Sequence, residues 1–366
     1  MRVALFKAFY SIEDDNVILN VFGRAEDDQR VEIQTYGHRP WFCVKEDPSI
    51  LSKSIPDWSK KVTDVKKECY DMYGNPLWKI YTKIPSYVGD KNQGLKKHFP
   101  FHYEADILFT NRVRIDYGIK YEFEVPEDFL TKEYWGYSGL IDINLIKAVE
   151  DQTINPYWWV IDIEVSDKEG YAQSKKPFAP VLSISIYDDK KNKFHILILE
   201  SINETIAIEK IKEKLDSHFS NYQLDIVQCQ DEETLFRRFF LLFEDSKPDL
   251  IMGWNFCEIG FREGYDIPYL RNRAKENDFK WINERKVMFF DLMTAAALQL
   301  GAGSYLKLDE FAKQRLKLEK EKLKDSIYST FVNNKIALAR YNLWDVVLCV
   351  IGIQKEGILD FYLNLA

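Results

Sequence analysis

The first 125 residues alternate short apolar runs with polar, glycine or proline breaks. Five of these runs are rich in β-branched and aromatic residues: 3–12, 16–23, 31–37, 40–46 and 77–84. Short runs of this composition, bounded by turn-forming residues, are typical of β-strands. We therefore predict a β-rich N-terminal domain over residues 1–130, with one or two helices, the clearest around Gln93–His98.

The pattern changes near Pro156, where apolar strand-like runs begin to alternate with amphipathic segments. Three runs predict successive strands of one sheet, and a fourth is a short buried strand: 157–165, 181–188, 193–200 and 250–255. Helical periodicity marks four further segments: 205–219, 231–249, 265–277 and 335–354. This alternation predicts an α/β domain with a mixed sheet over residues 131–366, so that the chain as a whole is α+β.

Composition supports a globular chain with two domains. The 366 residues exceed what one core usually organises, and 46% hydrophobic with 30% charged residues is ordinary for globular proteins. No run of about 18 apolar residues occurs, and the N-terminus lacks a signal peptide pattern. The expectation is a cytoplasmic protein without a membrane span.

Two features receive ordinary structural interpretations. The five cysteines are scattered and form no C-x-x-C pair, so reduced thiols are expected rather than a disulfide framework or a zinc site. The Lys/Glu-rich run at 316–325 is interpreted as a solvated helix face.

The net charge of −8 weighs weakly against nucleic-acid binding, but carboxylates that bind cations would themselves add negative charge.

Two acids interrupt the apolar run at 157–165. Asp162 and Glu164 are two residues apart, so in a strand both side chains point to the same face. Like charges at this distance repel, and burial raises the cost, so a cation must compensate them. An exposed edge strand is the alternative, but the flanking Trp158 and Trp159 favour a central strand.

Two more polar positions follow the short strand at 250–255. Asn255 comes just after the apolar residues, where open α/β sheets place functional groups. Asp266 precedes Ile267 and Pro268, so it is a candidate ligand or, alternatively, a helix N-cap.

The last candidates lie on the predicted helix at 335–354. Tyr341 and Asp345 are four residues apart and share a face with Leu338 and Leu348, which should pack inward. A carboxylate on an apolar face is explained by a metal ion or, alternatively, by a buried lysine or arginine partner.

Together these positions predict a two-metal site. The candidate ligands are all hard oxygen donors, which favour Mg²⁺ or Mn²⁺ over zinc: Asp162, Glu164, Asp266 and Asp345. Two such ions about 4 Å apart can activate a water and stabilise the leaving oxygen in an attack on phosphorus. Tyr341, beside Asp345, is placed to orient that water.

These elements resemble the Exo I, Exo II and Exo III motifs of the proofreading exonuclease in family B DNA polymerases. The matching segments are 162–165, 249–270, 289–293 and 341–345, and the segments 36–44 and 103–119 are similar to the archaeal branch. The resemblance implies a ribonuclease H-like domain that removes nucleotides 3′→5′ from single-stranded DNA ends. By motif position it implies the four carboxylates as metal ligands, Tyr341 as the water-orienting residue and Asn255 in strand binding.

The sequence departs from that family in two respects. Ten residues separate Asn255 from Asp266, more than Exo II usually has, and we interpret them as a loop insertion. The palm and fingers motifs of a polymerase are absent. We therefore expect DNA synthesis on a primer–template only together with a separate C-terminal part, as in a split polymerase or a truncated chain.

Two alternatives remain open. One is a non-catalytic template-binding and assembly subunit that senses uracil, because Tyr10, Pro40 and Phe109 roughly match the uracil pocket of archaeal relatives. The other is a nuclease for RNA or damaged ends, which shares the site chemistry and differs only in substrate.

Overall fold

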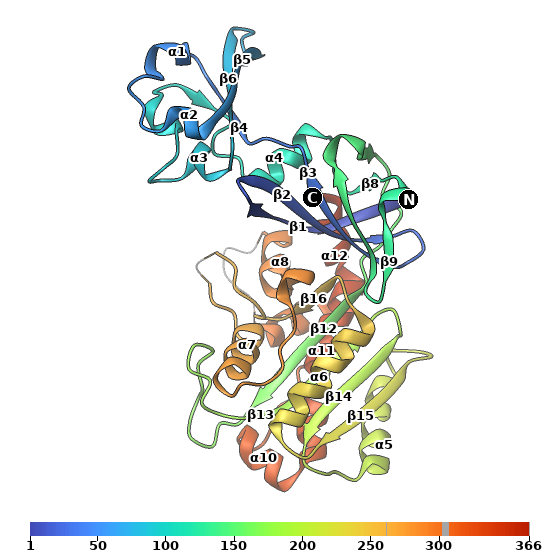
Figure 1. The fold of residues 1–366 in the computed structure, drawn as a ribbon. Helices are drawn as coiled ribbons and strands as arrows, with labels where there is room; N and C mark the ends of the chain where they lie inside the picture. Colours follow the sequence, from blue (N-terminus) through green and yellow to red (C-terminus); the bar gives the residue numbers. More distant parts are fainter. Residues whose placement is uncertain (261, 302–306, 366) are drawn as a thin grey trace. The chain divides into compact units, whose positions relative to one another are not determined.

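The computed structural model describes residues 1–260, 262–301 and 307–365. The chain forms two compact units, Met1–Asn155 and Pro156–Ala366 (Figure 1). This boundary differs from the one predicted after residue 130, because three later strands join the N-terminal sheet. β10 (Gly136–Asp142) pairs in parallel with β3 (Arg30–Tyr36), a long-range pairing that local composition does not reveal.

The N-terminal unit contains two sheets, each with its own hydrophobic cluster. The seven-stranded sheet has the order β11-β8-β1-β2-β3-β10-β9, and the four-stranded sheet has the order β5-β6-β4-β7. The remaining strands are β1 (Arg2–Glu13), β2 (Asn16–Ala25), β4 (Trp41–Val44), β5 (Val62–Tyr70), β6 (Pro76–Thr82), β7 (His102–Tyr103), β8 (Glu122–Glu124), β9 (Thr131–Glu133) and β11 (Lys147–Val149).

Short helices connect these strands. They are α1 (Pro48–Leu51), α2 (Trp58–Lys61), α3 (Ser86–Gly89), η1 (Lys96–His98), α4 (Phe109–Asp116), η2 (Glu127–Phe129) and η3 (Ile143–Leu145). All five predicted strands are confirmed, as β1 to β4 and β6. The sequence pattern missed β5, which is mostly exposed and charged, and the predicted helix around Gln93–His98 is only the 3₁₀ turn η1.

The expectation of reduced cysteines is wrong for one pair. Cys43 in β4 and Cys69 in β5 form a disulfide with a Cα–Cα distance of 7.0 Å. The pairing of β5 with β6 is irregular between Lys66 and Cys69, and the two cysteines lie 26 positions apart in the sequence, so their spacing did not indicate the bond. The other three cysteines are free and buried, as expected.

The second unit is built on one mixed sheet with the order β15-β14-β13-β12-β16-β17, as expected for the fold. β12 pairs antiparallel with β13 and parallel with β16. The strands are β12 (Trp158–Val165), β13 (Val181–Asp188), β14 (Lys193–Leu199), β15 (Gln223–Cys229), β16 (Leu250–Gly253) and β17 (Met288–Asp291).

Helices cover both faces of this sheet (Figure 1). The main ones are α5 (Glu204–Leu215), α6 (Glu232–Ser246), α7 (Asp266–Glu276), α8 (Leu292–Gln299), α10 (Ile327–Asn333), α11 (Lys335–Glu356) and α12 (Ile358–Leu365). The short ones are η4 (Glu284–Lys286), α9 (Leu308–Phe311) and η5 (Ala312–Leu316). Trp159 points from β12 to α6, where it meets Phe239 and Phe243, whereas α11 packs on the opposite face.

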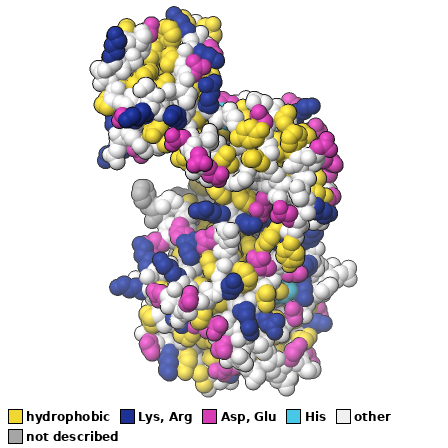
Figure 2. Space-filling view, in the orientation of Figure 1, with side chains coloured by type: hydrophobic (Ala, Val, Ile, Leu, Met, Phe, Trp, Pro, Cys, Tyr) yellow, Lys and Arg dark blue, Asp and Glu magenta, His cyan; other side chains and the backbone are white. Residues whose placement is uncertain are grey.

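α11 is the one helix among the described residues that is long and apolar enough to span a membrane. Its most apolar window has a mean hydropathy of 1.6, but 78% of that window is buried inside the protein. It packs against β12 and β13, as the central helix of a globular core does. On the face drawn in Figure 2, basic and acidic side chains are interspersed, so the net charge of −8 is not gathered there into one surface.

Candidate metal centre

Asp162 and Glu164 project from the C-terminal half of β12 toward α11. β12 lies between β13 and β16, so the predicted central strand is confirmed and an edge strand is excluded. Glu164 is buried, and Asp162 is partly buried. Strand periodicity thus places both carboxylates on the face of the sheet that packs against α11, whose buried residues are mostly apolar.

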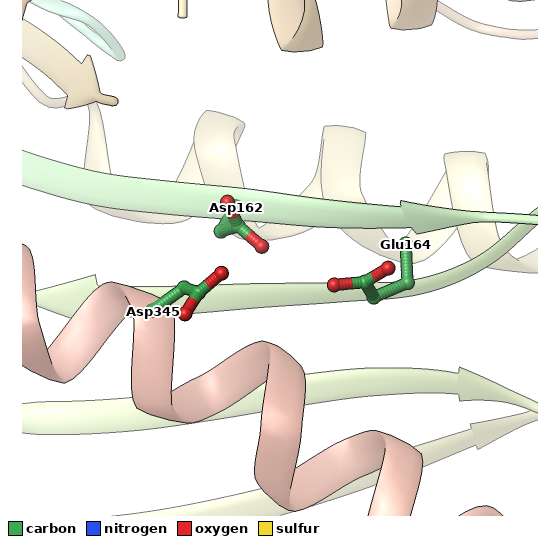
Figure 3. Close-up of side chains that lie close together, drawn as sticks. All are labelled: Asp162, Glu164 and Asp345. Carbon is green, nitrogen blue, oxygen red and sulfur yellow. The ribbon is translucent and has the colours of Figure 1, made fainter. Parts of the chain in front are cut away.

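Asp345 of α11 faces these two acids. One carboxylate oxygen from each of Asp162, Glu164 and Asp345 lies within 4.8 Å of the others. Figure 3 shows the three side chains pointing toward one another from β12 and α11. An ion placed among these oxygens would touch ligands from two elements that lie about 180 residues apart in the sequence.

Asp266 lines the same cavity as these three acids. It is the first residue of α7, whose N-cap is Tyr265, and no side chain caps this helix, so the N-cap role is excluded. Asp266 is 5% exposed, and its Oδ2 is buried without a hydrogen-bond partner among the described residues.

The four carboxyls all hold their protons more tightly than free acids do. Burial, followed by the charge of Asp345, raises the pKa of Asp162 to about 8. Burial raises the pKa of Glu164 and of Asp266 well above the usual range, and the neighbouring carboxylates add to both shifts. Burial raises the pKa of Asp345 to about 6, against the opposing charge of Lys320.

These observations fit a site for divalent cations. Oδ2 of Asp266 and Oδ1 of Asp345 are buried without partners, which is costly for carboxylates unless a cation satisfies them. The donor set is made of carboxylate oxygens, the ligands that Mg²⁺ and Mn²⁺ prefer.

The raised pKa values predict how the stability of the metal-free protein depends on pH. These carboxyls stay protonated in the folded state to a higher pH than in the unfolded chain, so the folded state binds more protons between about pH 4 and pH 8. Stability should therefore fall as pH rises through this window, by at most about 1.4 kcal/mol per pH unit for each carboxyl that is protonated only in the folded state, a contribution that for Asp345 ends near pH 6.

The measurement is thermal unfolding in chelator at pH 5, 6, 7 and 8. The midpoint should fall with rising pH, and added Mn²⁺ should restore it most at pH 8, where protons compete least. A midpoint that is flat or rises over this range in chelator would contradict the electrostatic account of the site.

Lys320 is a functional candidate that the sequence pattern missed. Its Nζ lies 2.5 Å from Oδ2 of Asp345 and 5.2 Å from the centre of the Tyr341 ring. Burial opposes its charge, but Asp345, Tyr341 and Asp162 raise the pKa of Lys320 above its usual value. The alternative of a buried cation partner for Asp345 is therefore realised in the same cavity as the four acids.

The interpretation of 316–325 as a helix face is wrong. Residues 317–325 are not helical, and several lie along α11: Trp344 Nε1 donates to Glu319 O (2.9 Å), and Arg340 pairs with Glu321 (3.1 Å). Tertiary contacts override the helical propensity of Lys and Glu here.

Asn342 of α11 holds one carboxylate oxygen of Asp162 by a hydrogen bond. It is fully buried, and its Nδ2 donates to Oδ2 of Asp162 (2.7 Å). Its Oδ1 accepts from the hydroxyls of Ser183 (2.9 Å) and Ser185 (2.6 Å) on β13. The signal for this network was present in the sequence, as an asparagine in the apolar helix and two alternating serines in an apolar strand.

Tyr341 is partly buried on α11, beside Lys320. Burial raises the pKa of Tyr341 to about 12, so its phenol is protonated at neutral pH and can donate a hydrogen bond. The charges of Asp345 and Glu164 add to this upward shift of the pKa, whereas the charge of Lys320 opposes it.

The two ends of the ten-residue segment between Asn255 and Asp266 lie together. Tyr265 N donates to Asn255 O (2.7 Å), which brings the two ends of the loop together. Gly264 is required, because its φ is +64° and a Cβ would lie 2.4 Å from Cys257 O. The loop therefore returns the chain to Asp266 despite its length.

A cavity of about 270 Å³ opens onto the carboxylates and contains both Asn255 and Asp266 in its lining. Two tyrosines also line it, and their rings stack with centroids 5.7 Å apart. Tyr171 is 74% exposed, and the hydroxyl of Tyr265 is held by Ala172 O (3.0 Å). The sequence pattern had not indicated which aromatic residues lie here.

Comparison with known proteins extends this picture. Residues 102–296 match the family model described as DNA polymerase family B, exonuclease domain. The fold is similar to that of the family B DNA polymerase from the hyperthermophilic archaeon Pyrobaculum calidifontis, with a TM-score of 0.72 and 20% sequence identity. That match covers 100% of this chain and 46% of the polymerase. No curated protein sequence matches the chain.

Proposed function

The chain belongs to the exonuclease-domain family of the family B DNA polymerases, and on this premise we propose that it removes nucleotides 3′→5′ from DNA ends with two divalent metal ions, Mg²⁺ or Mn²⁺. The observation that carries the proposal is the convergence of acids from β12, α7 and α11 on one cavity. An inert fold would gain nothing from gathering four mutually repelling carboxylates, three of them buried, around one cavity.

The proposed roles follow from the contacts. Asp162, Glu164, Asp266 and Asp345 would hold the ions, which supply Lewis-acid stabilisation and a nucleophilic water. Asn342 fixes one oxygen of Asp162, so the other is left for a ligand. The neutral phenol of Tyr341 would orient the attacking water, and the ammonium of Lys320 would stabilise negative charge that develops on the phosphate.

Tyr171 and Tyr265 would hold the terminal bases, because stacking accepts any base. Replacing Tyr171 by alanine should raise KM for single-stranded 3′ ends about tenfold and leave kcat nearly unchanged, since one stacked base is worth about 1–3 kcal/mol. Tyr171→Phe retains the ring and should behave like the wild type. An unchanged KM in Tyr171→Ala would remove this residue from the strand-binding site.

The test of the function is a 5′-labelled DNA strand incubated with the protein in Mg²⁺ or in chelator. Shortening in single-nucleotide steps from the 3′ end, dependent on Mg²⁺, is expected. An RNA strand and a mismatched duplex serve as parallel substrates, and faster cleavage of RNA would favour the alternative nuclease. A strand that stays intact in Mg²⁺ and Mn²⁺ would defeat the proposal.

More than half of the matched polymerase lies outside the aligned region. We therefore propose primer–template DNA as the working substrate, with editing performed for a polymerase domain on the same or on a separate polypeptide. Mixing with such a domain should increase removal of mismatched over matched 3′ ends.

A second candidate function rests on a cavity in the N-terminal unit. Tyr10, Pro40 and Phe109 line one cavity of about 410 Å³, and the rings of Tyr10 and Phe109 meet edge to face at 5.4 Å. These are the three residues that resembled a uracil pocket. We propose that this cavity receives a template base, in addition to or instead of the nuclease role.

Binding of strands that differ only in one uracil or thymine tests this candidate in the absence of divalent metal. Tighter binding of the uracil strand, lost in Phe109→Ala, is expected. Equal affinities would leave the cavity without this role.

A further inference from the structure

Arg262 lies within the inserted loop and contacts Asn255, a residue that lines the cavity. Its Nη2 donates to Oδ1 of Asn255 at 2.5 Å. Its Nη1 donates to Oδ1 of Asp291 (3.1 Å) and to Oγ1 of Thr294 (2.6 Å). The Arg262 side chain is only 16% exposed, so the loop directs this cation inward and not into solvent.

The chemistry of this contact fixes the orientation of the Asn255 amide. A guanidinium can only donate hydrogen bonds, so the amide atom that faces it must be the oxygen. The Nδ2 group then points away from Arg262, with two hydrogens to donate. Asn255 lines the cavity, and with its Oδ1 taken by Arg262 its side chain can offer an occupant the Nδ2 donors.

Arg262 is itself held in place. Asp291, at the end of β17, is 2% exposed and accepts Phe256 N at 2.6 Å and Thr294 N at 2.8 Å. One buried carboxylate thus joins the first residue of the loop, the start of α8 and Arg262. The guanidinium is therefore held in one position by its partners and can hold the Asn255 side chain in one orientation.

The backbone offers a competing reason for an asparagine at this position. Asn255 has a φ of +58°, a conformation in which asparagine and glycine are favoured. If only the backbone mattered, glycine would serve equally well. This difference gives a way to separate the side chain from the backbone.

We propose that Arg262 is a positioning residue that presets the Asn255 amide as a donor to an acceptor oxygen of the bound strand, on a phosphate, a sugar or a base. The inserted loop is then a working part of the strand site. This inference rests on the proposed function, because the occupant is the 3′-terminal strand.

The test is a double-mutant cycle on Asn255 and Arg262. It measures the affinity for a fluorescent single-stranded oligonucleotide in Ca²⁺ and then KM and kcat in Mg²⁺. Asn255→Gly keeps the left-handed backbone without strain and removes only the side chain. Asn255→Gly and Arg262→Ala should each weaken binding about fivefold, the value of roughly one hydrogen bond, and the double variant should be no weaker than Asn255→Gly. KM should rise in each with kcat within about twofold.

Two further variants separate positioning from loop stability. Arg262→Lys keeps a cation beside Asp291 but cannot span both partners, so it should fold like the wild type and still bind weakly. Arg271→Ala removes an arginine that holds the same loop through Glu258 (2.6 Å) without touching Asn255, and it should bind normally.

Independent effects that multiply to about 25-fold in the double variant would overturn the proposal. So would wild-type binding by Arg262→Lys, or equal weakening by Arg271→Ala. A wild-type protein that binds the strand but does not cut it would defeat the proposed function and leave the cycle interpretable. A wild-type protein that binds no strand would overturn the inference itself.

Discussion

Replacing Asp162 and Glu164 together by alanine is expected to lower the rate of 3′-end removal by at least about a thousandfold. The pair supplies half of the candidate ligands from the central strand, and loss of metal-based charge stabilisation costs several kcal/mol, at about 1.4 kcal/mol per tenfold in rate. Initial rates on a 5′-labelled single strand in Mg²⁺ measure the effect.

The same variant should unfold at a higher temperature than the wild type in chelator. When no cation is bound, burial and mutual repulsion make the ionised forms of Asp162 and Glu164 costly in the folded state, so removing both side chains relieves that state. Each kcal/mol gained raises the midpoint by roughly 2–4 °C in a domain of this size. Losing activity while gaining metal-free stability distinguishes a functional site from a structural one.

A matched control removes two exposed acids of α5, in Glu209→Ala/Glu213→Ala. Its net charge changes equally, but its activity and its midpoint in chelator should stay near the wild-type values. Comparable activity in Asp162→Ala/Glu164→Ala and in this control would refute the assignment of the site.

Replacing Lys320 by methionine is expected to cost about a hundredfold in rate. Methionine keeps the length and packing of the side chain, so the change removes chiefly the charge beside Asp345, and loss of one charge-stabilising donor at a reacting centre typically costs a factor of 10²–10³. The loss should appear in kcat rather than in KM, because the charge acts on the reacting phosphate.

Stability gives a second readout of Lys320. In chelator, the Lys320→Met variant has no cation beside Asp345, so its free energy of unfolding should be about 2–3 kcal/mol lower than that of the wild type. This loss is smaller than the 3–5 kcal/mol typical of a broken buried ion pair, because the Lys320 side chain is 26% exposed. Mn²⁺ should recover much of this loss. Lys322→Met, an exposed neighbour in the same charged run, should change neither the rate nor the midpoint. A variant at Lys320 with wild-type kcat would show that the ammonium serves structure alone.

Local periodicity was sufficient for the parts of the site that lie within one element. Asp162 and Glu164 share a strand face, and Tyr341 and Asp345 share a helix face, so the spacing in the sequence already predicted each pair. The structure places the four carboxylates Asp162, Glu164, Asp266 and Asp345 around one cavity, and Tyr341 lies beside Lys320, which lines the same cavity. Their roles as ligands stay predictions until a metal is measured.

Features that depend on long-range contacts could not be predicted from the sequence. Lys320 lies in a charged run whose composition indicates a solvated helix, but its neighbours on both sides are held by α11. The Cys43–Cys69 disulfide and the pairing of β10 with β3 likewise depend on strands brought together by the fold. Composition records what a residue is, whereas these roles depend on which distant segment it meets.

The most direct test of the central claim is a calorimetric titration of the metal-free protein with Mn²⁺ near pH 6.5, in two buffers with different ionisation enthalpies. We expect saturable binding that releases protons, since the carboxyls with raised pKa values must deprotonate to bind. Binding should weaken at least about tenfold in Asp266→Asn and vanish in Asp162→Ala/Glu164→Ala, because each change removes ligands from one shared site. An isotherm that is the same in the wild type and both variants would contradict the claim that these acids form one metal centre.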